Sequence, residues 1–223
     1  EHQMVRVQEM LRGRTEEAEK SRDEIQKLIS EIAHQMRTPL ANMETYTGLL
    51  TERMESGDET KMQPLLVYTA ALEESGRKLH FLTESFIKMS RLEQGIIQIR
   101  KEETDLLQTV KNVLGQIQNQ AEEKQICFDI TFPEKVICPH DANWLGEAIG
   151  NLLDNAVKYS SSGGRIELSV CENEMFAKIR VRDFGLGIDP GEENQIFRRF
   201  YRGKRVTVQE GFGIGLYLAR EIV

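Results

Sequence analysis

The sequence has few of the residues that stabilise secreted or membrane proteins. Its 223 residues include three cysteines, Cys127, Cys138 and Cys171, which are far apart and not in a spacing typical of metal ligands. A disulfide framework and a zinc cluster are therefore disfavoured, and we expect reduced thiols, as in a cytosol. The sequence has no apolar run long enough to cross a bilayer and does not begin like a signal peptide, so we expect a soluble chain.

The chain also lacks the positive charge of a nucleic-acid-binding protein. It has 29 Lys and Arg residues against 36 Asp and Glu residues, which is a formal net charge of −7 at pH 7. Nucleic acid is therefore disfavoured as a partner. Apolar residues make up 39% of the chain, which is enough for a real core, and the length allows one or two domains.

Apolar residues recur every seven positions in the first part of the chain, which is typical of a coiled-coil seam. The seam comprises Met4, Leu11, Ala18, Ile25 and Ile32, with Val7 and Leu28 at the offset of three. It predicts one long helix over residues 1 to about 54, of which 1–24 form an N-terminal coiled coil. Because this helix is longer than a globular domain needs, we expect it to transmit a signal.

A second heptad seam follows a turn predicted at Glu52–Lys61. It comprises Leu65, Leu72, Leu79 and Phe86, with Tyr68, Leu82 and Met89 at the offset of three. Two long seams joined by a short loop predict a helical hairpin over residues 25–95. One hairpin cannot bury seams this narrow, so we expect two copies to dimerise into a four-helix bundle.

One histidine lies beside the first seam. Counting Ile32 as the first position of its heptad, His34 lies two residues on and points outward. Pro39 cannot donate a hydrogen bond to the carbonyl of Gln35, so we expect the helix to bend or loosen within a turn of His34. A helical histidine is more often structural than catalytic, and its functional interpretation depends on the rest of the chain.

The periodicity changes after about residue 95, where strands begin to alternate with helices. We expect a strand around Ile97 and Ile99, a helix over Leu106–Ala121, a strand over Ile126–Phe132, a helix over Asn143–Tyr159, and strands at Arg165–Val170 and Ala177–Val181 joined at Glu172–Glu174. The expected fold class is α plus α+β, in which residues 96–223 place helices on one face of a mostly antiparallel sheet.

The helix predicted at Asn143–Tyr159 has an apolar stripe and an opposite polar face. Spacings of four, four and three positions place on that face Glu147, Asn151, Asn155 and Lys158. Such a face is usually only solvated surface. Here its amides and carboxylate are suited to Mg²⁺, its ammonium is suited to phosphate, and the adjacent Tyr159 could stack on a base.

Two glycine clusters follow this helix. Asp183-Phe-Gly185-Leu-Gly187 comes directly after a strand, where glycine lets the backbone approach a ligand and Asp183 could accept from an exocyclic amine such as that of adenine. Gly211-Phe-Gly213-Ile-Gly215-Leu216 opens a helix whose free N–H groups favour phosphate. Asp-Phe-Gly also occurs in eukaryotic-type protein kinases, but the other motifs of that class are absent and we reject the match.

Together these segments resemble the cytoplasmic transmitter of a two-component sensor histidine kinase over essentially the whole chain. The matching motifs are the H box at Ala33–Leu40, the N box at Asn151–Tyr159, the G1 box at Asp183–Gly187, the F box at Phe197–Phe200 and the G2 box at Gly211–Leu216. The resemblance implies a dimerising phosphoacceptor hairpin followed by an α/β-sandwich ATP-binding domain. That domain type is shared by gyrase, chaperones, histidine kinases and mismatch-repair proteins.

The resemblance also implies roles for individual residues. His34 would accept the phosphoryl group beside Gln35, and Thr38 would position water for dephosphorylating the partner. Mg²⁺ would be bound by Asn155 and Asn151. ATP would be bound by Asn151, Asn155, Lys158, Tyr159, Asp183, Gly185, Gly187, Arg199, Gly211, Gly213, Gly215 and Leu216. A lid over ATP would extend from about Gly191 to Gln209.

Two features depart from the family pattern. The family usually has Glu or Asp after the histidine to accept the imidazole proton, whereas Gln35 can only hold the ring tautomer through its amide oxygen. General-base assistance is typically worth about 10²–10⁴ in rate, so we expect slow autophosphorylation unless water or another carboxylate helps. The chain also stops at Val223, before further strands that the family normally has, so we expect the ATP-binding sheet to lack an edge.

The expected function is autophosphorylation of His34 from ATP, followed by transfer to an aspartate in the receiver domain of a response regulator and dephosphorylation of that regulator. One alternative is a non-catalytic dimeric scaffold that binds nucleotide only to set its conformation. Another is an ATPase of the gyrase, chaperone or mismatch-repair type, which the hairpin with His34 disfavours. We expect the cytoplasmic portion of a membrane-anchored protein, which meets the membrane only through an N-terminal sensor region outside this chain.

Overall fold

The structure, a computed structural model, divides into two units, Glu1–Glu84 and Ser85–Val223. It describes the backbone of residues 2–56, 62–93, 99–206 and 211–223. Side chains are described for residues 22–23, 25–54, 65–93, 99–206 and 211–223. The seam positions predicted from Met4 to Ala18 therefore lie outside the described side chains, although their backbone is helical.

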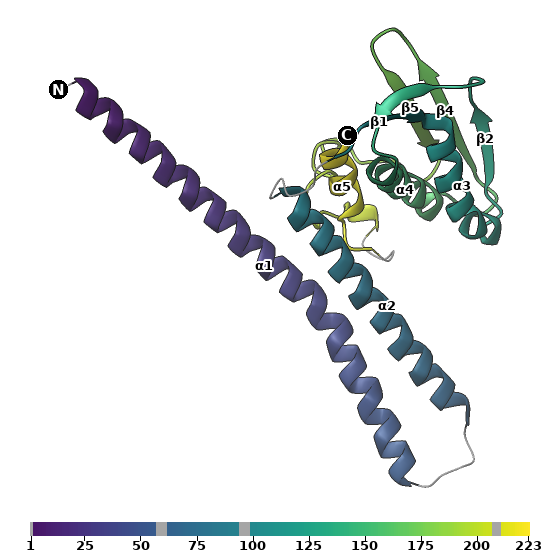
Figure 1. The fold of residues 1–223 in the computed structure, drawn as a ribbon. Helices are drawn as coiled ribbons and strands as arrows, with labels where there is room; N and C mark the ends of the chain where they lie inside the picture. Colours follow the sequence, from purple (N-terminus) through teal and green to yellow (C-terminus); the bar gives the residue numbers. More distant parts are fainter. Residues whose placement is uncertain (1, 57–61, 94–98, 207–210) are drawn as a thin grey trace. The chain divides into compact units, whose positions relative to one another are not determined.

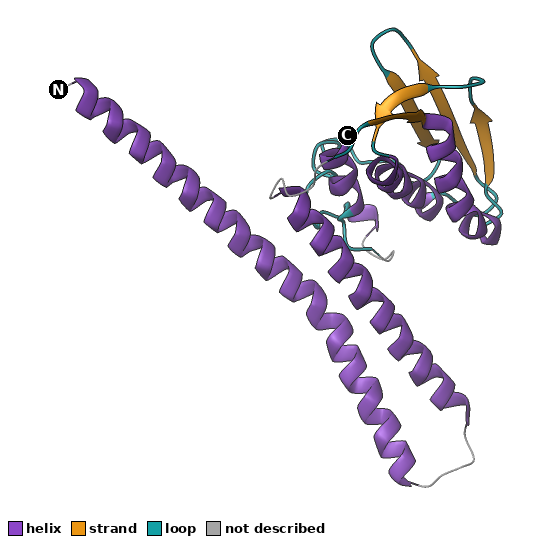
Figure 2. Cartoon of the chain, viewed as in Figure 1, coloured by secondary structure: helices purple, strands orange, loops and turns teal. Residues whose placement is uncertain are grey.

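The described residues of the first unit are all helical (Figure 2). They form α1, His2–Ser56, and most of α2, Met62–Glu93, which Figure 1 labels. The two long helices predicted from the heptad repeats are confirmed.

The turn predicted at Glu52–Lys61 begins too early, because its first residues are good helix formers and α1 continues through Ser56. Positions 57–61 lie outside the described residues.

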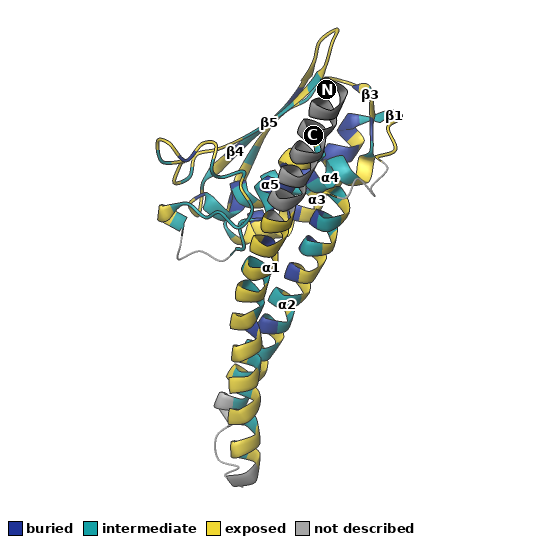
Figure 3. Cartoon of the chain, turned by 90° about the vertical axis from the view of Figure 1, so that its left-hand side faces the viewer, coloured by how far each residue is buried: buried dark blue, intermediate teal, exposed yellow. Residues whose placement is uncertain are grey.

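Burial along the hairpin is uneven. Leu28 and Leu82 of the two seams are buried, whereas Ile25 and Phe81 are each 51% exposed. Exposed residues predominate along the part of α1 whose side chains are described (Figure 3). Large apolar side chains on a helix surface favour a partner that covers them. The burial pattern therefore supports the expected pairing of two copies.

In the second unit two helices cover one face of a three-stranded sheet (Figures 1 and 2). The helices are α3, Leu106–Glu123, and α4, Ala142–Tyr159. The strands, in spatial order, are β2, Cys127–Thr131, β4, Arg165–Glu172, and β5, Ala177–Asp183. β2 runs parallel to β4, and β4 forms an antiparallel hairpin with β5. The predicted fold class, a helical hairpin followed by an α/β ATP-binding domain, is confirmed.

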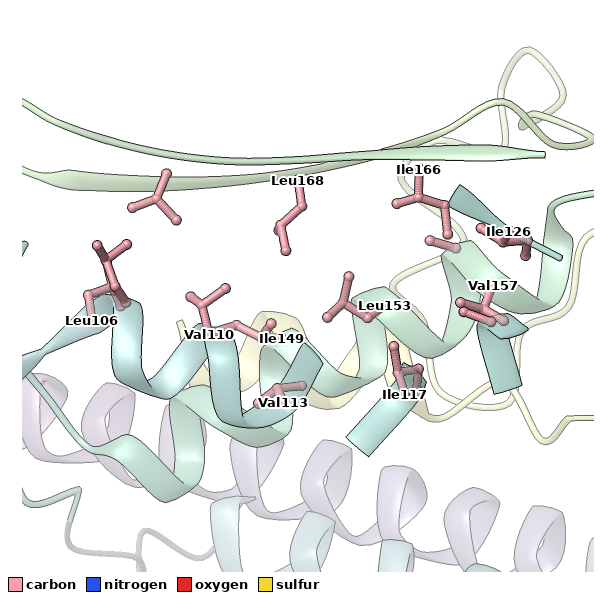
Figure 4. Packing of buried hydrophobic residues seen from close by; sticks show 14 of the residues in the cluster. Leu106, Val110, Val113, Ile117, Ile126, Ile149, Leu153, Val157, Ile166 and Leu168 are labelled. Atoms are coloured by element: carbon pink, nitrogen blue, oxygen red, sulfur yellow. The ribbon is translucent and has the colours of Figure 1, made fainter. Parts of the chain in front are cut away.

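The core of the second unit lies between this sheet and the two helices (Figure 4). Alternate residues of β4, including Ile166 and Leu168, point toward the helices and are fully buried. Val110 and Ile117 of α3 and Leu153 of α4 meet them from the other side. The two strands β4 and β5 were predictable from the sequence, because side chains of a strand alternate between two faces.

Shortening Leu153 to alanine is expected to lower the free energy of unfolding by about 2–5 kcal/mol, because the cavity left in a packed core is only partly refilled. Leu153 is 0% exposed, whereas Ile130 on β2 is 43% exposed. Ile130→Ala is the matched control, with an expected loss of less than about 1 kcal/mol. Urea unfolding of both variants, followed by circular dichroism, measures the difference. Equal losses would contradict this assignment of the core.

The sequence did not predict a second, two-stranded sheet. In it β1, Glu102–Asp105, pairs antiparallel with β3, Ile137–His140. The strand predicted around Ile97 and Ile99 is wrong at Ile99, which lies outside any strand. Ile97 lies outside the described residues. Each of the strands β1 and β3 has four residues, the shortest run in which an alternating pattern can be recognised. The expected single, mostly antiparallel sheet is therefore two sheets, one of which contains a parallel pair.

The turn of the β4–β5 hairpin lies slightly later than predicted. β4 continues through Glu172, which the prediction assigned to the turn. Asn173 then forms the turn, because its Oδ1 accepts hydrogen bonds from the backbone N–H of Met175 and of Phe176, at 2.9 and 2.8 Å. Such side-chain turns are typical of asparagine.

Candidate functional site

The polar face of α4 forms the base of the candidate site. Asp141 caps the helix, since its Oδ1 accepts from the backbone N–H of Asn143 and of Trp144 at 3.0 and 3.2 Å. The opposite face is buried in the core and includes Ala148, Ile149, Leu153, Ala156 and Val157. The half-buried residues on the other side are Glu147, Asn151, Asn155, Lys158 and Tyr159. The predicted two-faced helix is confirmed.

The first glycine cluster meets the C-terminal end of α4. A Cβ atom built on Gly185 would overlap the backbone carbonyl oxygen of Tyr159, so a side chain does not fit there. The Oδ1 of Asp183, the last residue of β5, accepts from the backbone N–H of Gly185 at 3.0 Å. This bond folds the loop back onto α4 and leaves the Asp183 carboxylate exposed at the edge of the site. Gly187, in the same loop, has a left-handed backbone.

The second glycine cluster meets α4 at two further points. A Cβ atom built on Gly211 would overlap the Nζ of Lys158. One built on Gly215 would lie 2.7 Å from the Oδ1 of Asn151. Because Asn151 and Lys158 lie two turns apart on α4, the glycine cluster runs along the polar face. Side chains on these glycines would fill the space beside the amide and ammonium groups.

The helix that follows the second glycine cluster starts without a side-chain cap. It is α5, Gly215–Ile222, which confirms the helix predicted there and places Leu216 in its first turn. By contrast, α3 and α4 are capped by Asp105 and Asp141. The first N–H groups of an uncapped helix are available to an anion, and the helix dipole favours one. The start of α5 therefore suits phosphate.

A lysine that the sequence analysis missed holds the end of α4. The Nζ of Lys124 donates to the backbone carbonyls of Val157, Lys158 and Ser160, at 3.0, 2.7 and 3.4 Å. A cation at a helix C-terminus satisfies its last carbonyls and complements the dipole. No local sequence pattern predicts this contact, because Lys124 lies more than thirty positions before its partners.

The neighbouring tyrosine is a neutral, partly buried ring. The Nζ of Lys158 lies 5.0 Å from the centroid of the Tyr159 ring. Burial raises the pKa of Tyr159 above its usual value, so the hydroxyl is protonated at neutral pH. A flat, uncharged ring at the end of the polar face is suited to stacking on a base.

Two charged residues near the site have protein partners. The Nζ of Lys88 lies 2.8 Å from the Oε1 of Glu147, whose carboxylate the sequence analysis considered for Mg²⁺. The Nη1 of Arg199 lies 2.9 Å from the Oε1 of Glu93. Neither Lys88 nor Glu93 was predicted, because each belongs to a helix end distant in sequence from its partner.

The segment predicted as a lid is described in part. Over residues 191–206 it consists of turns and one short 3-10 helix, Lys204–Val206. The Nη2 of Arg205, near the end of this segment, lies 2.6 Å from the Oδ1 of Asp189, which precedes it. The remaining positions up to Gln209 lie outside the described residues.

The donor set of the site suits a magnesium ion that arrives with phosphates. Among the described residues, no three His, Cys, Asp or Glu side chains lie close enough together to hold a metal ion. Mg²⁺ is usually bound through one or two protein oxygens together with substrate phosphates and water. The Oδ1 of Asn151 faces the start of α5, and Asn155 lies one turn further along the same face. These amides fit Mg²⁺ carried by a nucleotide.

The predicted phosphoacceptor lies in the first unit. His34 and Thr38 are exposed on α1, one turn apart, and Gln35 is half-buried between them. Pro39 is buried, and α1 stays helical through it. The imidazole is therefore accessible to a reactant. None of the described helices has the length and hydropathy of a membrane span.

The fold and the site define a phosphoacceptor hairpin joined to an ATP-binding α/β domain. Residues 9–95 match the family described as the His Kinase A (phospho-acceptor) domain. Residues 140–223 match the family described as histidine kinase-, DNA gyrase B- and HSP90-like ATPases. The chain belongs to the sensor histidine kinases and contains both domains of their transmitter, which confirms the resemblance found in the sequence.

Individual proteins show the same similarity. The sensor protein kinase PmrB of Pseudomonas aeruginosa is 29% identical over 197 residues, which are 88% of this chain and 40% of that protein. The histidine kinase AdeS of Acinetobacter baumannii has the same fold, with a TM-score of 0.66 at 19% identity over 85% of each chain. A structure of histidine kinase ThkA in complex with response regulator protein TrrA gives a TM-score of 0.56 at 16% identity, over 88% of this chain and 54% of that one. This chain spans about a third to a half of the relatives' length.

Proposed function

We propose that this chain is the catalytic part of an ATP-dependent protein histidine kinase in which His34 accepts the γ-phosphoryl group. The observation that carries the proposal is the convergence of both glycine clusters on the polar face of α4, where they meet Asn151, Lys158 and Tyr159. The backbone of the glycine clusters therefore lies beside the amide of Asn151, the ammonium of Lys158 and the end of α4 at Tyr159. An exposed histidine on the preceding hairpin supplies the acceptor.

Phosphoryl transfer mainly requires in-line positioning and neutralisation of charge. A ring nitrogen of neutral His34 attacks the γ-phosphorus, the new N–P bond forms, and the bond to the bridging oxygen breaks to release ADP. Asn155 and Asn151 would hold Mg²⁺, which offsets phosphate charge when bound. Lys158 would bind phosphate, Tyr159 would stack on the base, and Asp183 would accept from the amino group of adenine.

The remaining nucleotide-binding residues are proposed from the same arrangement. The backbone of Gly185 and Gly187 would border the base, and the glycines of the second cluster with Leu216 would present N–H groups to the phosphates at the start of α5. Arg199 would add a guanidinium to those phosphates.

The proposed partners are a second copy of this chain and the receiver domain of a response regulator. Exposed apolar side chains on the hairpin support dimerisation. His34 and Thr38 lie on one accessible stretch of α1, where a receiver aspartate would take the phosphoryl group and where Thr38 would position water for its later removal. The ThkA complex with TrrA is an example of such a partnership in a protein of the same fold.

The direct test is incubation of the chain with γ-labelled ATP and Mg²⁺, followed by treatment of the labelled protein with acid and with alkali. A phosphohistidine loses its label in acid and keeps it in alkali. Label with these properties supports the kinase. ATP binding without label would favour the scaffold alternative, and rapid dephosphorylation of a regulator without self-labelling would favour a phosphatase.

Changing Gln35 to glutamate is expected to raise the initial rate of self-labelling at least about tenfold, because a carboxylate beside His34 can accept the imidazole proton that the amide cannot. Gln26→Glu is the matched control, since Gln26 is exposed on the same helix about two turns earlier. The self-labelling rate of Gln26→Glu is expected to equal that of the unaltered chain. The initial rates of both variants and of the unaltered chain are measured at saturating ATP. No gain in Gln35→Glu would mean that another group already accepts the proton.

A further inference from the structure

The last turn of α2 belongs to the second unit and is held there by a three-residue cluster. The Oε1 of Glu93 lies 2.9 Å from the Nη1 of Arg199 and accepts a hydrogen bond from the hydroxyl of Tyr217 at 2.8 Å. The guanidinium of Arg199 also lies over the Tyr217 ring, 5.1 Å from its centroid. The side chains come from α2, from the F box and from α5, so the cluster joins three segments at a single carboxylate oxygen.

The cluster is more than a surface ion pair. Tyr217 is buried, and the side chains of Glu93 and Arg199 are each only 27% exposed. Burial first, and then the hydrogen bond to Glu93, raise the pKa of Tyr217, so its hydroxyl remains a donor at any physiological pH. Hydrogen bonds to an ionised group are roughly twice as strong as those between neutral groups. Glu93 is therefore held by two donors at once.

Arg199 is also attached to the candidate phosphate site. Tyr217, on which its guanidinium stacks, follows Gly215 by two residues on α5, and Gly215 packs against Asn151. Gly213 has φ +70, and a Cβ atom built on it would lie 2.8 Å from the backbone carbonyl carbon of Phe200, so the F box and the second glycine cluster touch directly. Arg199 thus packs against α5, the helix whose uncapped start suits phosphate.

The preceding turn of α2 has its own attachment. The Nζ of Lys88 lies 2.8 Å from the Oε1 of Glu147, and Met89 is completely buried. This attachment involves none of the residues proposed to bind nucleotide. It would hold the end of α2 near Arg199 if the side chains of Glu93 and Arg199 separated.

We propose that Glu93 and the terminal phosphates of a nucleoside triphosphate compete for Arg199, so that nucleotide binding loosens the last turn of α2. The proposal rests on the proposed function, because it requires ATP to lie along α4. A guanidinium that forms a bond to the Glu93 carboxylate cannot give the same donor to a phosphate. By linkage, the contact with Glu93 weakens triphosphate binding to the same degree as the triphosphate weakens that contact.

The competition gives α2 a role beyond that of a support. α2 is one helix from Met62 to Glu93, and its earlier part belongs to the hairpin unit. Release of Glu93 therefore acts at one end of a helix whose other end is part of the phosphoacceptor hairpin. Glu93 is a positioning residue in this scheme, because it acts on the nucleotide only through Arg199.

The test is the affinity of the full chain for ATP and for AMP in the presence of Mg²⁺, measured by titration calorimetry. Glu93→Gln keeps the shape and an acceptor for Tyr217 but removes the charge. It is expected to tighten ATP binding about fivefold or more, the lower range of typical coupling between sites, and to leave AMP binding unchanged because AMP lacks the terminal phosphates. Glu221→Gln is the matched control, since Glu221 pairs with Arg220 on α5 and not with Arg199. Its affinity for ATP is expected not to change.

A double-mutant cycle with Arg199→Ala separates competition from a general effect of charge. In that background Glu93→Gln is expected to have no further effect on ATP affinity. The same gain in both backgrounds would overturn the proposal, and so would an unchanged affinity in Glu93→Gln when the unaltered chain binds ATP. Failure of the unaltered chain to bind ATP would overturn the proposed function and the competition together.

Tyr217→Phe provides a second variant in case Glu93→Gln does not fold. It removes the hydroxyl that holds Glu93 but keeps the ring beneath Arg199. Tighter binding of ATP than in the unaltered chain, with AMP binding unchanged, is expected. Unchanged or weaker ATP binding in Tyr217→Phe would contradict the competition.

Discussion

Replacing His34 by alanine is expected to reduce ATP-dependent labelling of the chain by more than about a hundredfold, because the residue that forms the covalent bond is lost. The affinity for ATP is expected to stay unchanged, since His34 lies in the first unit and the nucleotide residues lie in the second. Both quantities can be measured on one preparation, by acid-labile incorporation of label and by titration calorimetry.

His80→Ala is the matched control for this experiment. His80 is also exposed and also lies on a helix of the first unit, but it has none of the neighbours that resemble an H box. His140, by contrast, is buried, and one of its ring nitrogens lies 2.9 Å from the hydroxyl of Thr109, so it is not accessible to ATP. Labelling that persists in His34→Ala and disappears in His80→Ala would move the phosphoacceptor to α2.

Gly185→Ala is expected to weaken ATP binding at least about tenfold and to lower the free energy of unfolding by about 1–3 kcal/mol, the usual cost of overpacking. The new Cβ would overlap the carbonyl oxygen of Tyr159, which is backbone and cannot rotate away. The loop that carries Asp183 would therefore move away from α4. This displacement would separate the residue proposed to read adenine from the ring proposed to stack on it.

Gly115→Ala is the matched control for this glycine. Gly115 lies in the middle of α3, and a Cβ atom built there meets nothing within 4 Å. Alanine is favoured over glycine inside a helix by about 1 kcal/mol, so this variant is expected to be slightly more stable and to bind ATP normally. Calorimetry and urea unfolding measure both effects. ATP binding that is normal in Gly185→Ala would show that the first glycine cluster does not border the nucleotide.

Much of the fold was predictable because its signals are local. A heptad repeat depends only on residues three and four positions apart, so α1 and α2 follow from the sequence. The polar face of α4 and the alternation along β4 are also local periodicities. The candidate nucleotide residues were recognised because they lie in short motifs next to these elements.

The elements that sequence reasoning missed depend on distant partners. β1 and β3 have four residues each and exist because they pair with one another across more than thirty positions. Such pairing leaves no pattern in either segment. The end of α1 was missed for a different reason, because helix propensity carried the helix beyond the predicted start of the turn.

The candidate site divides in the same way. The sequence by itself determined which motifs are present and in what order, since each motif is a short run of residues that suits phosphate, base or metal. Only the tertiary structure decided that the two glycine clusters meet the same face of α4 and that Lys124 closes its end. It also decided that Glu93 holds Arg199. These contacts join segments separated by tens of residues, and packing of the whole domain brings them together.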